Sequence, residues 1–137
     1  MKSKQRHFSL EEANTLVPEV ESLLRAYHEK KQTYERNHDY IFMNELLLRL
    51  EDPSRSKDSS GKWEKEARDL DDAYASLEME IAGIAALGCV IRSMEKGMID
   101  FLGMHGGETV YFSWRMGEKS IQYYRSVSSP VSERLPL

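Results

Sequence analysis

The hydrophobic residues of this chain change their spacing at Gly88, and this change constrains the fold more than any other feature. Before Gly88, apolar residues recur every three or four positions, which is the period of an amphipathic α-helix. After it, short runs of β-branched and aromatic residues are bounded by glycine-containing turns, as in antiparallel strands. The sequence therefore predicts an α+β fold, in which a long antiparallel, coiled-coil-like helical hairpin precedes a small three- or four-stranded antiparallel β-meander.

The first helix has a clear start signal. Ser9 followed by Glu12 matches the capping box, in which the two side chains satisfy free backbone N–H groups at a helix start. Pro18 cannot donate a helical hydrogen bond, so we expect a kink or a short break near residues 15–17. Beyond it, apolar residues recur at intervals of seven as far as Leu48, which predicts one long helix.

The second helix has the most regular apolar seam of the chain. We expect it to follow a loop over residues 51–62 and to end at Gly88, which occupies the position of a left-handed C-cap. Its seam has the a/d spacing of a coiled coil and consists of Trp63, Ala67, Leu70, Tyr74, Leu77, Ile81 and Ile84. Two helices and a small sheet do not cover a seam this long. We therefore predict a homodimer whose interface includes residues 30–75; a monomer with a projecting hairpin is the alternative.

A length of 137 residues fits one domain. We divide residues 1–137 into a hairpin over 8–88, a β-meander over 89–125 and an irregular tail over 126–137. The formal charge of −4 argues against nucleic-acid and anionic-membrane binding, because both require a positive surface. The sequence has no run that is long and apolar enough to insert into a membrane, and its single cysteine suits a reducing compartment, so we expect a cytoplasmic protein.

Several polar residues lie within or beside the predicted strands and are candidates for a ligand site. They are Asp100, Trp114, Arg115, Glu118, Arg125 and Arg134. A guanidinium presents a planar fork that suits a carboxylate or a phosphate, and an indole can stack on a planar group. The alternative is an internal salt bridge, such as Asp100 with Arg115 across two neighbouring strands.

Signals for catalysis and for metal binding are weak. Glu35 and His38 have the spacing of a di-iron motif, and His28 lies on a similar helical face, but such sites need a second motif and further carboxylates. We expect no cofactor. Cys89 begins a predicted buried strand, and the sequence has no Gly-x-Ser-x-Gly elbow. Residues 103–107 are rich in glycine but lack a following helix, so they predict a hairpin loop.

Five segments, in this order, resemble a bacterial protein family. They are Phe8-Ser-Leu-Glu-Glu-Ala-Asn-Thr-Leu-Val-Pro18, Leu87-Gly88, Gly97-Met-Ile-Asp-Phe101, Trp114-Arg-Met-Gly-Glu118 and Arg134-Leu-Pro-Leu137. Together they are similar to the family known as domain of unknown function 2203, over nearly the whole chain. Some members of that family look like coiled-coil cell-division proteins and have been labelled as such. The chain departs from the family at Ser113, where the pattern has Cys, at Tyr124-Arg125, where it has Trp-His, and at Glu133, where it has Gly.

The sequence favours a non-enzymatic oligomerising or adaptor module. In this hypothesis the hairpin makes the dimer, and the sheet contacts a protein partner. A small-ligand binding or sensor protein, with a site around Asp100, Trp114 and Arg115, is the second hypothesis. A hydrolase or a metal enzyme is the third.

Overall fold

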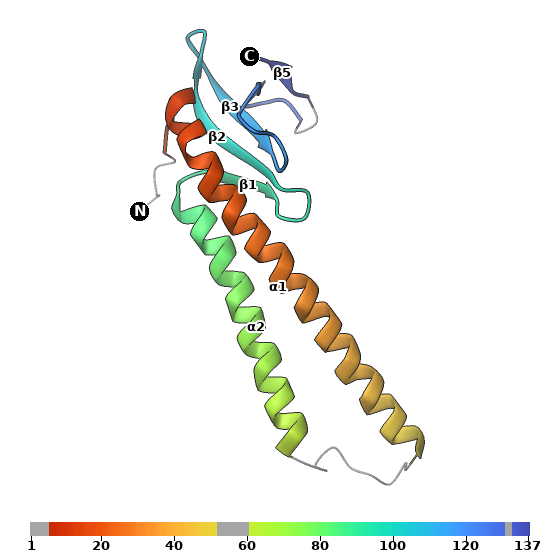
Figure 1. The fold of residues 1–137 in the computed structure, drawn as a ribbon. Helices are drawn as coiled ribbons and strands as arrows, with labels where there is room; N and C mark the ends of the chain where they lie inside the picture. The colour runs from red at the N-terminus through yellow and green to blue at the C-terminus, as the bar shows by residue number, and fades with distance from the viewer. Residues whose placement is uncertain (1–5, 52–60, 131–132) are drawn as a thin grey trace. The chain divides into compact units, whose positions relative to one another are not determined.

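The computed structural model describes residues 6–51, 61–130 and 133–137, which form two helices followed by a five-stranded sheet (Figure 1). The elements are α1 (Leu10–Glu51), α2 (Gly61–Ala86), β1 (Val90–Ser93), β2 (Met98–His105), β3 (Glu108–Arg115), β4 (Tyr123–Ser126) and β5 (Leu135–Pro136). This arrangement confirms the predicted α+β fold of a helical hairpin followed by an antiparallel meander.

The chain divides into two compact units. One unit combines Met1–Ala26 with Glu80–Leu137, and it contains the sheet, the start of α1 and the end of α2. The other unit, Tyr27–Met79, contains the remainder of both helices. We call them the sheet unit and the hairpin unit.

The capping box predicted at the start of α1 is present. The Glu12 backbone N–H donates to Ser9 Oγ at 3.0 Å, and the Ser9 N–H donates to Glu12 Oε1 at 3.1 Å. The break expected before Pro18 is absent, because α1 runs through this residue. Ala13 and Val20, which are both fully buried, lie on either side of the proline in one core, and this packing holds the helix together.

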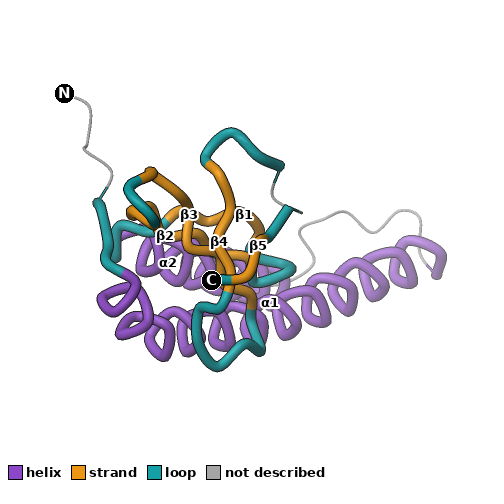
Figure 2. The backbone as a smooth tube through the Cα atoms, turned by 90° about the horizontal axis from the view of Figure 1, so that it is seen from above, coloured by secondary structure: helices purple, strands orange, loops and turns teal. Residues whose placement is uncertain are grey.

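The sheet has the strand order β1-β2-β3-β4-β5, and each strand pairs antiparallel with the next. Figure 2 shows the strands in orange and the helices in purple. It therefore contains one strand more than the three or four expected. The additional strand, β5, comes from the tail that we expected to be irregular. Tyr123 pairs with Pro136 and Tyr124 with Leu135, and the Leu137 N–H donates to the Gln122 carbonyl at 2.9 Å, so the tail continues the meander.

Alternation along the strands separates an inner from an outer face of the sheet. The inner face packs on the helices of the sheet unit, and its core includes Val20, Leu24, Ile84, Ile99, Phe101, Val110, Phe112 and Trp114. Val110, Phe112 and Trp114, which alternate along β3, are all buried. Gly88 has a φ of 92°, and its N–H donates to the Ala85 carbonyl at 3.0 Å, as the predicted C-cap requires. The outer face consequently receives the intervening residues of each strand.

The hairpin unit is much less buried than the sheet unit. In its seam Leu77 is only 7% exposed, but Tyr74 is 54% exposed and makes a ring contact with Tyr34 at 6.1 Å between centroids. Most of the loop predicted over 51–62, and the side chain of Trp63, lie outside the described residues. Within the described residues, neither helix combines the length and the apolar character needed to cross a membrane.

Candidate functional site

The polar residues singled out in the sequence gather on the outer face of the sheet, with one exception. Trp114 faces inward and is completely buried, so it is not available for stacking on a ligand. Asp100 lies on β2, Arg115 on β3 and Arg125 on β4, and strand alternation turns all three away from the helices. The outer face therefore combines charged side chains from several strands.

Asp100 is the centre of the first cluster on this face. The residue is 2% exposed, and its Oδ2 accepts from Arg125 Nη2 at 2.5 Å and from Arg92 Nε at 2.8 Å. The Arg125 side chain is 3% exposed, whereas the Arg92 side chain is 29% exposed. One buried carboxylate is thus shared by one buried and one partly exposed guanidinium, which leaves this cluster with a net positive charge.

The expected salt bridge between Asp100 and Arg115 is wrong. The strand register places Ser113 opposite Asp100 and Met98 opposite Arg115. Arginine has a long side chain, so Arg92 and Arg125 reach Asp100 from β1 and β4 instead. Asp100 does form an internal salt bridge, as expected, but its partners are Arg92 and Arg125 and not Arg115.

Tyr111 completes the Asp100 cluster. The guanidinium carbons of Arg92 and Arg125 lie 4.7 and 4.8 Å from the centroid of its ring. Partial burial disfavours the charged form of Arg92 and lowers its pKa. The hydrogen bond to Asp100, the negative charge of Asp100 and the interaction with Tyr111 outweigh this effect, so the pKa of Arg92 is raised. Arg125 Nη1 also donates to the Ser129 carbonyl at 2.7 Å. The cluster therefore connects four strands and the segment after β4.

A second cluster is built around Glu118, just beyond β3. Arg134 donates to its carboxylate twice, from Nη2 to Oε1 at 2.6 Å and from Nη1 to Oε2 at 3.1 Å. Arg134 also donates to Ser113 Oγ at 3.0 Å and to the Ser113 carbonyl at 2.9 Å, and its guanidinium lies 4.3 Å from the Tyr123 ring centroid. This bidentate pair attaches the C-terminal segment to the sheet.

Glu118 also fixes the end of β3. Its Oε1 accepts from the Arg115 backbone N–H at 2.7 Å, and its carbonyl accepts from Trp114 Nε1 at 2.8 Å. The buried indole therefore has a structural hydrogen-bond partner. The side-chain carboxylate and the backbone carbonyl of Glu118 thus both accept hydrogen bonds from other residues of the sheet unit.

Arg115 and Arg125 each have a buried Nε that lacks a hydrogen-bond partner among the described residues. Arg125 is otherwise paired through its Nη atoms, whereas no ion pair to the Arg115 guanidinium is present among the described residues. On this face Arg92, Arg115, Arg125 and Arg134 stand against Asp100 and Glu118, so positive charge is in excess. Arg92, Tyr111 and Tyr123 were not among the candidates from the sequence. Of the three, only Tyr111 could have been found from the sequence, by the period-two alternation of the eight-residue strand β3.

The remaining candidates do not form a reactive group. Burial raises the pKa of the Cys89 thiol to about 11, and its Sγ–H donates to the Ile84 carbonyl at 3.2 Å. Lys31 lies 3.9 Å from Glu35, and Asp39 lies 3.7 Å from His38 Nδ1, while His28 contacts the Tyr27 ring. Across the described residues, no group of three or more His, Cys, Asp and Glu side chains is placed to hold a metal ion.

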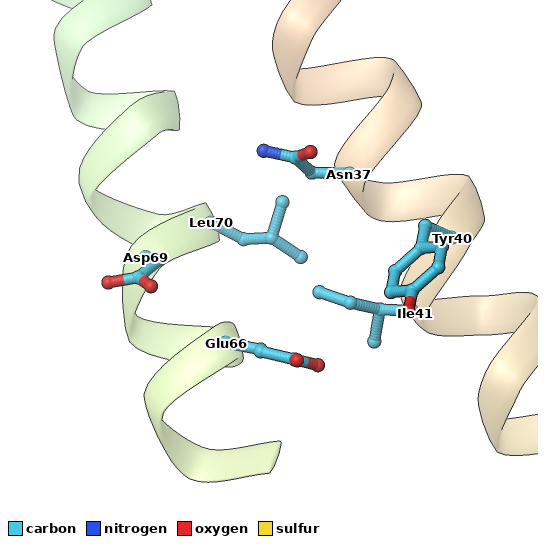
Figure 3. A pocket seen from close by; sticks show the side chains of 6 residues that line it. All are labelled: Asn37, Tyr40, Ile41, Glu66, Asp69 and Leu70. Atoms are coloured by element: carbon cyan, nitrogen blue, oxygen red, sulfur yellow. The ribbon is translucent and has the colours of Figure 1, made fainter. Parts of the chain in front are cut away.

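The hairpin unit contains a hollow of about 220 Å³ between α1 and α2 (Figure 3). It is lined by Asn37, Tyr40, Ile41, Glu66, Asp69 and Leu70. Ile41 and Leu70 point toward each other across it, and Glu66 points in from α2 (Figure 3). Glu66 Oε2 is buried without a hydrogen-bond partner among the described residues. The hairpin is thus loosely packed at this level.

The same unit exposes a group of large apolar side chains near the end of α1, which we call the α1 patch. Its members are Tyr40, Phe42, Met43, Leu46, Leu47 and Leu50, with exposed fractions between 39% and 79%. Such a concentration is unusual, because a monomeric protein seldom presents a contiguous apolar surface of this kind without a binding role.

Comparison with known proteins gives one match. A model of the family described as "Uncharacterized conserved protein (DUF2203)" matches residues 6–137, which is essentially the whole chain. No curated protein and no solved structure matches.

Proposed function

We propose that this chain, which belongs to the DUF2203 family of uncharacterized conserved proteins, is a non-enzymatic module that self-associates through its helical hairpin and contacts a partner through its sheet. The family description assigns no activity, so the proposal rests on the chemistry of the surfaces. The observation that carries it is the α1 patch. The single cysteine, Cys89, supports the accompanying expectation of a cytoplasmic protein, since one thiol without a disulfide partner suits a reducing compartment.

The size of the α1 patch supports an interface. If a large apolar side chain presents on the order of 200 Å² when fully exposed, the six residues together expose roughly 700 Å². This area is slightly larger than the largest apolar patch of a typical monomer. It also approaches the approximately 800 Å² that each partner contributes to a standard interface. Association that covers the patch would remove a substantial apolar area from water.

The spacing within the α1 patch fits helix pairing. Tyr40, Met43, Leu47 and Leu50 are separated by three, four and three residues, which is the a/d pattern of a coiled coil. Ile41 lines the hollow opposite Leu70 of α2, and at 3.6 residues per turn Met43 and Leu50 lie roughly on the opposite side of α1 from it. This stripe therefore remains available after α1 has packed against α2.

A second copy of the chain is the occupant that we propose. The four residues of the stripe are uncharged, so the stripe is compatible with an identical stripe related by a two-fold axis. Each copy brings the same apolar area, and two such patches together reach the size of a small specific interface. Because the stripe lacks charge, we expect self-association to depend little on salt.

The sheet supplies the second surface of the proposal. Its outer face carries arginine and tyrosine side chains, which are enriched where proteins contact one another. Arg92 and Arg134 remain 29% and 12% exposed, and each lies against a tyrosine ring. Rigid, hydrogen-bonded side chains of this kind lose little conformational entropy when a partner binds.

The test is the molar mass in solution. Sedimentation equilibrium from low to high micromolar concentration should give twice the chain mass of 15.9 kDa. The double variant Leu47→Glu/Leu50→Glu places charges in the proposed interface but disturbs no core, since both residues are at least half exposed. It should sediment as a monomer. Met104→Glu is the matched control, because Met104 is 59% exposed on the sheet unit, and it should stay dimeric.

Two outcomes would reject self-association through the hairpin. One is a wild-type protein that is monomeric over the whole concentration range. The other is a dimer that survives Leu47→Glu/Leu50→Glu but dissociates with Met104→Glu, which would move the interface to the sheet unit.

A further inference from the structure

The C-terminal segment, residues 133–137, forms one edge of the sheet through β5 but buries little apolar surface. Its ladder with β4 consists of two residue pairs, Tyr123 with Pro136 and Tyr124 with Leu135. Leu135 is 51% exposed and Leu137 is 41% exposed, and neither belongs to the core of the sheet unit. Apolar burial therefore contributes little to the attachment of this segment.

Arg134 is the anchor of the C-terminal segment. Its guanidinium donates four hydrogen bonds of 2.6–3.1 Å, two to the Glu118 carboxylate and two to Ser113. Four of the five N–H groups of the guanidinium are thus used. The guanidinium carbon also lies 4.3 Å from the centroid of the Tyr123 ring. Ser113, Glu118 and Tyr123 together hold one planar cation, and we call them the arginine site.

The sheet holds the arginine site in place independently of the segment that fills it. Ser113 on β3 and Tyr123 on β4 face each other in the β3–β4 ladder, and Ser113 is 2% exposed. Glu118 Oε1 also accepts from the Arg115 backbone N–H at 2.7 Å. A site that is formed in advance loses little conformational entropy when it binds. Beside it, the edge of β4 that pairs with β5 can pair with any other extended segment.

We propose that the arginine site and the adjoining edge of β4 bind an extended segment of a partner protein, in which an arginine is followed by apolar residues and proline. The chain's own C-terminal segment shows the chemistry that fits, with Arg134 in the arginine site and the backbone of Leu135–Pro136 along β4. Main-chain pairing at a sheet edge gives affinity, and the side-chain site gives specificity. Only arginine has the planar fork for two parallel hydrogen bonds to one carboxylate.

This inference rests on the proposed contact of the sheet with a partner, and it names the chemistry of that partner. In the isolated chain the C-terminal segment fills the site and competes with the partner. A segment tethered by a few residues acts at an effective concentration on the order of 1 mM. The partner must therefore exceed this competition, and loss of the Arg134 anchor should open the site.

Binding of a synthetic peptide to the full chain tests the inference. The peptide Glu-Arg-Leu-Pro-Leu has the sequence of residues 133–137 and carries a fluorophore at its N-terminus, so that fluorescence anisotropy measures its binding. We expect the dissociation constant to be lower for Arg134→Ala than for the wild type by a factor of about ten or more, because the tethered competitor has lost its anchor. Glu133→Ala is the matched control. Glu133 is the exposed neighbour of Arg134, and this variant should bind the peptide as weakly as the wild type.

A second peptide, Glu-Lys-Leu-Pro-Leu, tests the role of the guanidinium. It keeps the positive charge but lacks the fork, so it should bind Arg134→Ala more weakly than the arginine peptide by a factor of about ten.

Backbone amide signals of ¹⁵N-labelled protein locate the binding. The Arg115 N–H donates to Glu118, so its signal should move in Arg134→Ala and return to the wild-type position when the arginine peptide is added. In the wild type, which keeps its native fold, millimolar peptide should displace the C-terminal segment. The signal of the Leu137 N–H, which donates to the Gln122 carbonyl, should then shift.

Three outcomes would overturn the inference. One is a peptide that neither binds Arg134→Ala nor moves the Leu137 signal of the wild type, and another is equal binding of the arginine and lysine peptides. The third is a wild-type dimer that dissociates with Arg134→Ala, because a second copy would then supply the segment. Leu47→Glu/Leu50→Glu should bind the arginine peptide as the wild type does, so the arginine site and the hairpin dimer succeed or fail separately.

Discussion

Replacing Asp100 with alanine removes the carboxylate that Arg92 and Arg125 share. Arg125 would keep its hydrogen bond to the Ser129 carbonyl and its contact with the Tyr111 ring, but its charge would be buried without a counterion. Breaking a buried ion pair from one side costs about 3–5 kcal/mol, because an uncompensated charge remains in a low-dielectric site. The Arg92 side chain is 29% exposed and can rehydrate, so its share is at most about 1 kcal/mol.

We therefore expect Asp100→Ala to lower the free energy of unfolding by about 4 kcal/mol, mostly through Arg125. Urea denaturation followed by far-ultraviolet circular dichroism measures this change. With a denaturant slope of about 2 kcal/mol/M, the midpoint should fall by about 2 M without a change in slope. A decrease of this size is a large part of the total stability of an ordinary domain.

The exposed ion pair between Glu21 and Arg25 is the matched control. Its contact distance of 2.6 Å is close to the 2.5 Å of Asp100 with Arg125, but the two side chains are 26% and 66% exposed. Glu21→Ala should therefore cost less than about 1 kcal/mol. If Asp100→Ala cost no more than Glu21→Ala, burial would not control the strength of these pairs, and the reasoning would be refuted.

A double-mutant cycle separates the pair from its surroundings. Arg125→Met should also be strongly destabilising, because it leaves Asp100 with only its partly exposed partner, Arg92. The double variant Asp100→Ala/Arg125→Met removes both buried charges, so it should cost less than the two single changes together, by about 2–3 kcal/mol. Additive effects would contradict direct coupling between the two side chains.

Three further changes test the local structure. Gly103→Ala should cost about 2–3 kcal/mol in urea denaturation, because an added Cβ would collide with the Phe8 carbonyl oxygen. Ser9→Ala should cost about 1 kcal/mol by the same measurement, because it removes the acceptor of the Glu12 N–H at the start of α1. Burial raises the pKa of Cys89 from 9.0 to about 11, so its contribution to stability is complete below pH 9.0 and is lost as the pH rises toward 11. Cys89→Ala should flatten that alkaline decrease in urea midpoint, and an unchanged pH dependence would show that the thiol is not responsible.

The sequence predicted those parts of the fold that depend on neighbouring residues. The reciprocal hydrogen bonds of Ser9 and Glu12 and the positive φ of Gly88 are local, so residue type and spacing are sufficient to find them. Of the kink or short break expected near Pro18, the break was wrong, because propensity was weighed without tertiary packing and the core on both sides of the proline keeps α1 continuous. The kink stays a prediction. The strand β5 was missed because a pair of residues carries no periodic signal.

The ligand-site candidates show a different limit. Trp114 and Arg115 were expected in one ligand site, but they lie on opposite faces of β3, and the partner of Asp100 depends on strand register and on diagonal reach across the sheet. Neither is encoded in the spacing within one strand. Arg92 lies on a strand of only four residues, where alternation is too short to mark it as an inward or outward residue from sequence.

In α2 the spacing of apolar residues predicts the position of the apolar face but not how far that face is buried. Its spacing correctly identified the apolar face of the helix, and Ile84 is completely buried in the core of the sheet unit. In the hairpin unit the same spacing continues, yet Tyr74 is 54% exposed and Glu66 Oε2 has no partner among the described residues. The spacing of apolar residues predicts which face of a helix is apolar. It does not predict which residues, of this chain or of another, pack against that face. The α1 patch has the same property on the other helix. Both helices of the hairpin unit expose apolar side chains, whereas the sheet unit is well packed, and this difference supports the proposal that the hairpin forms an interface.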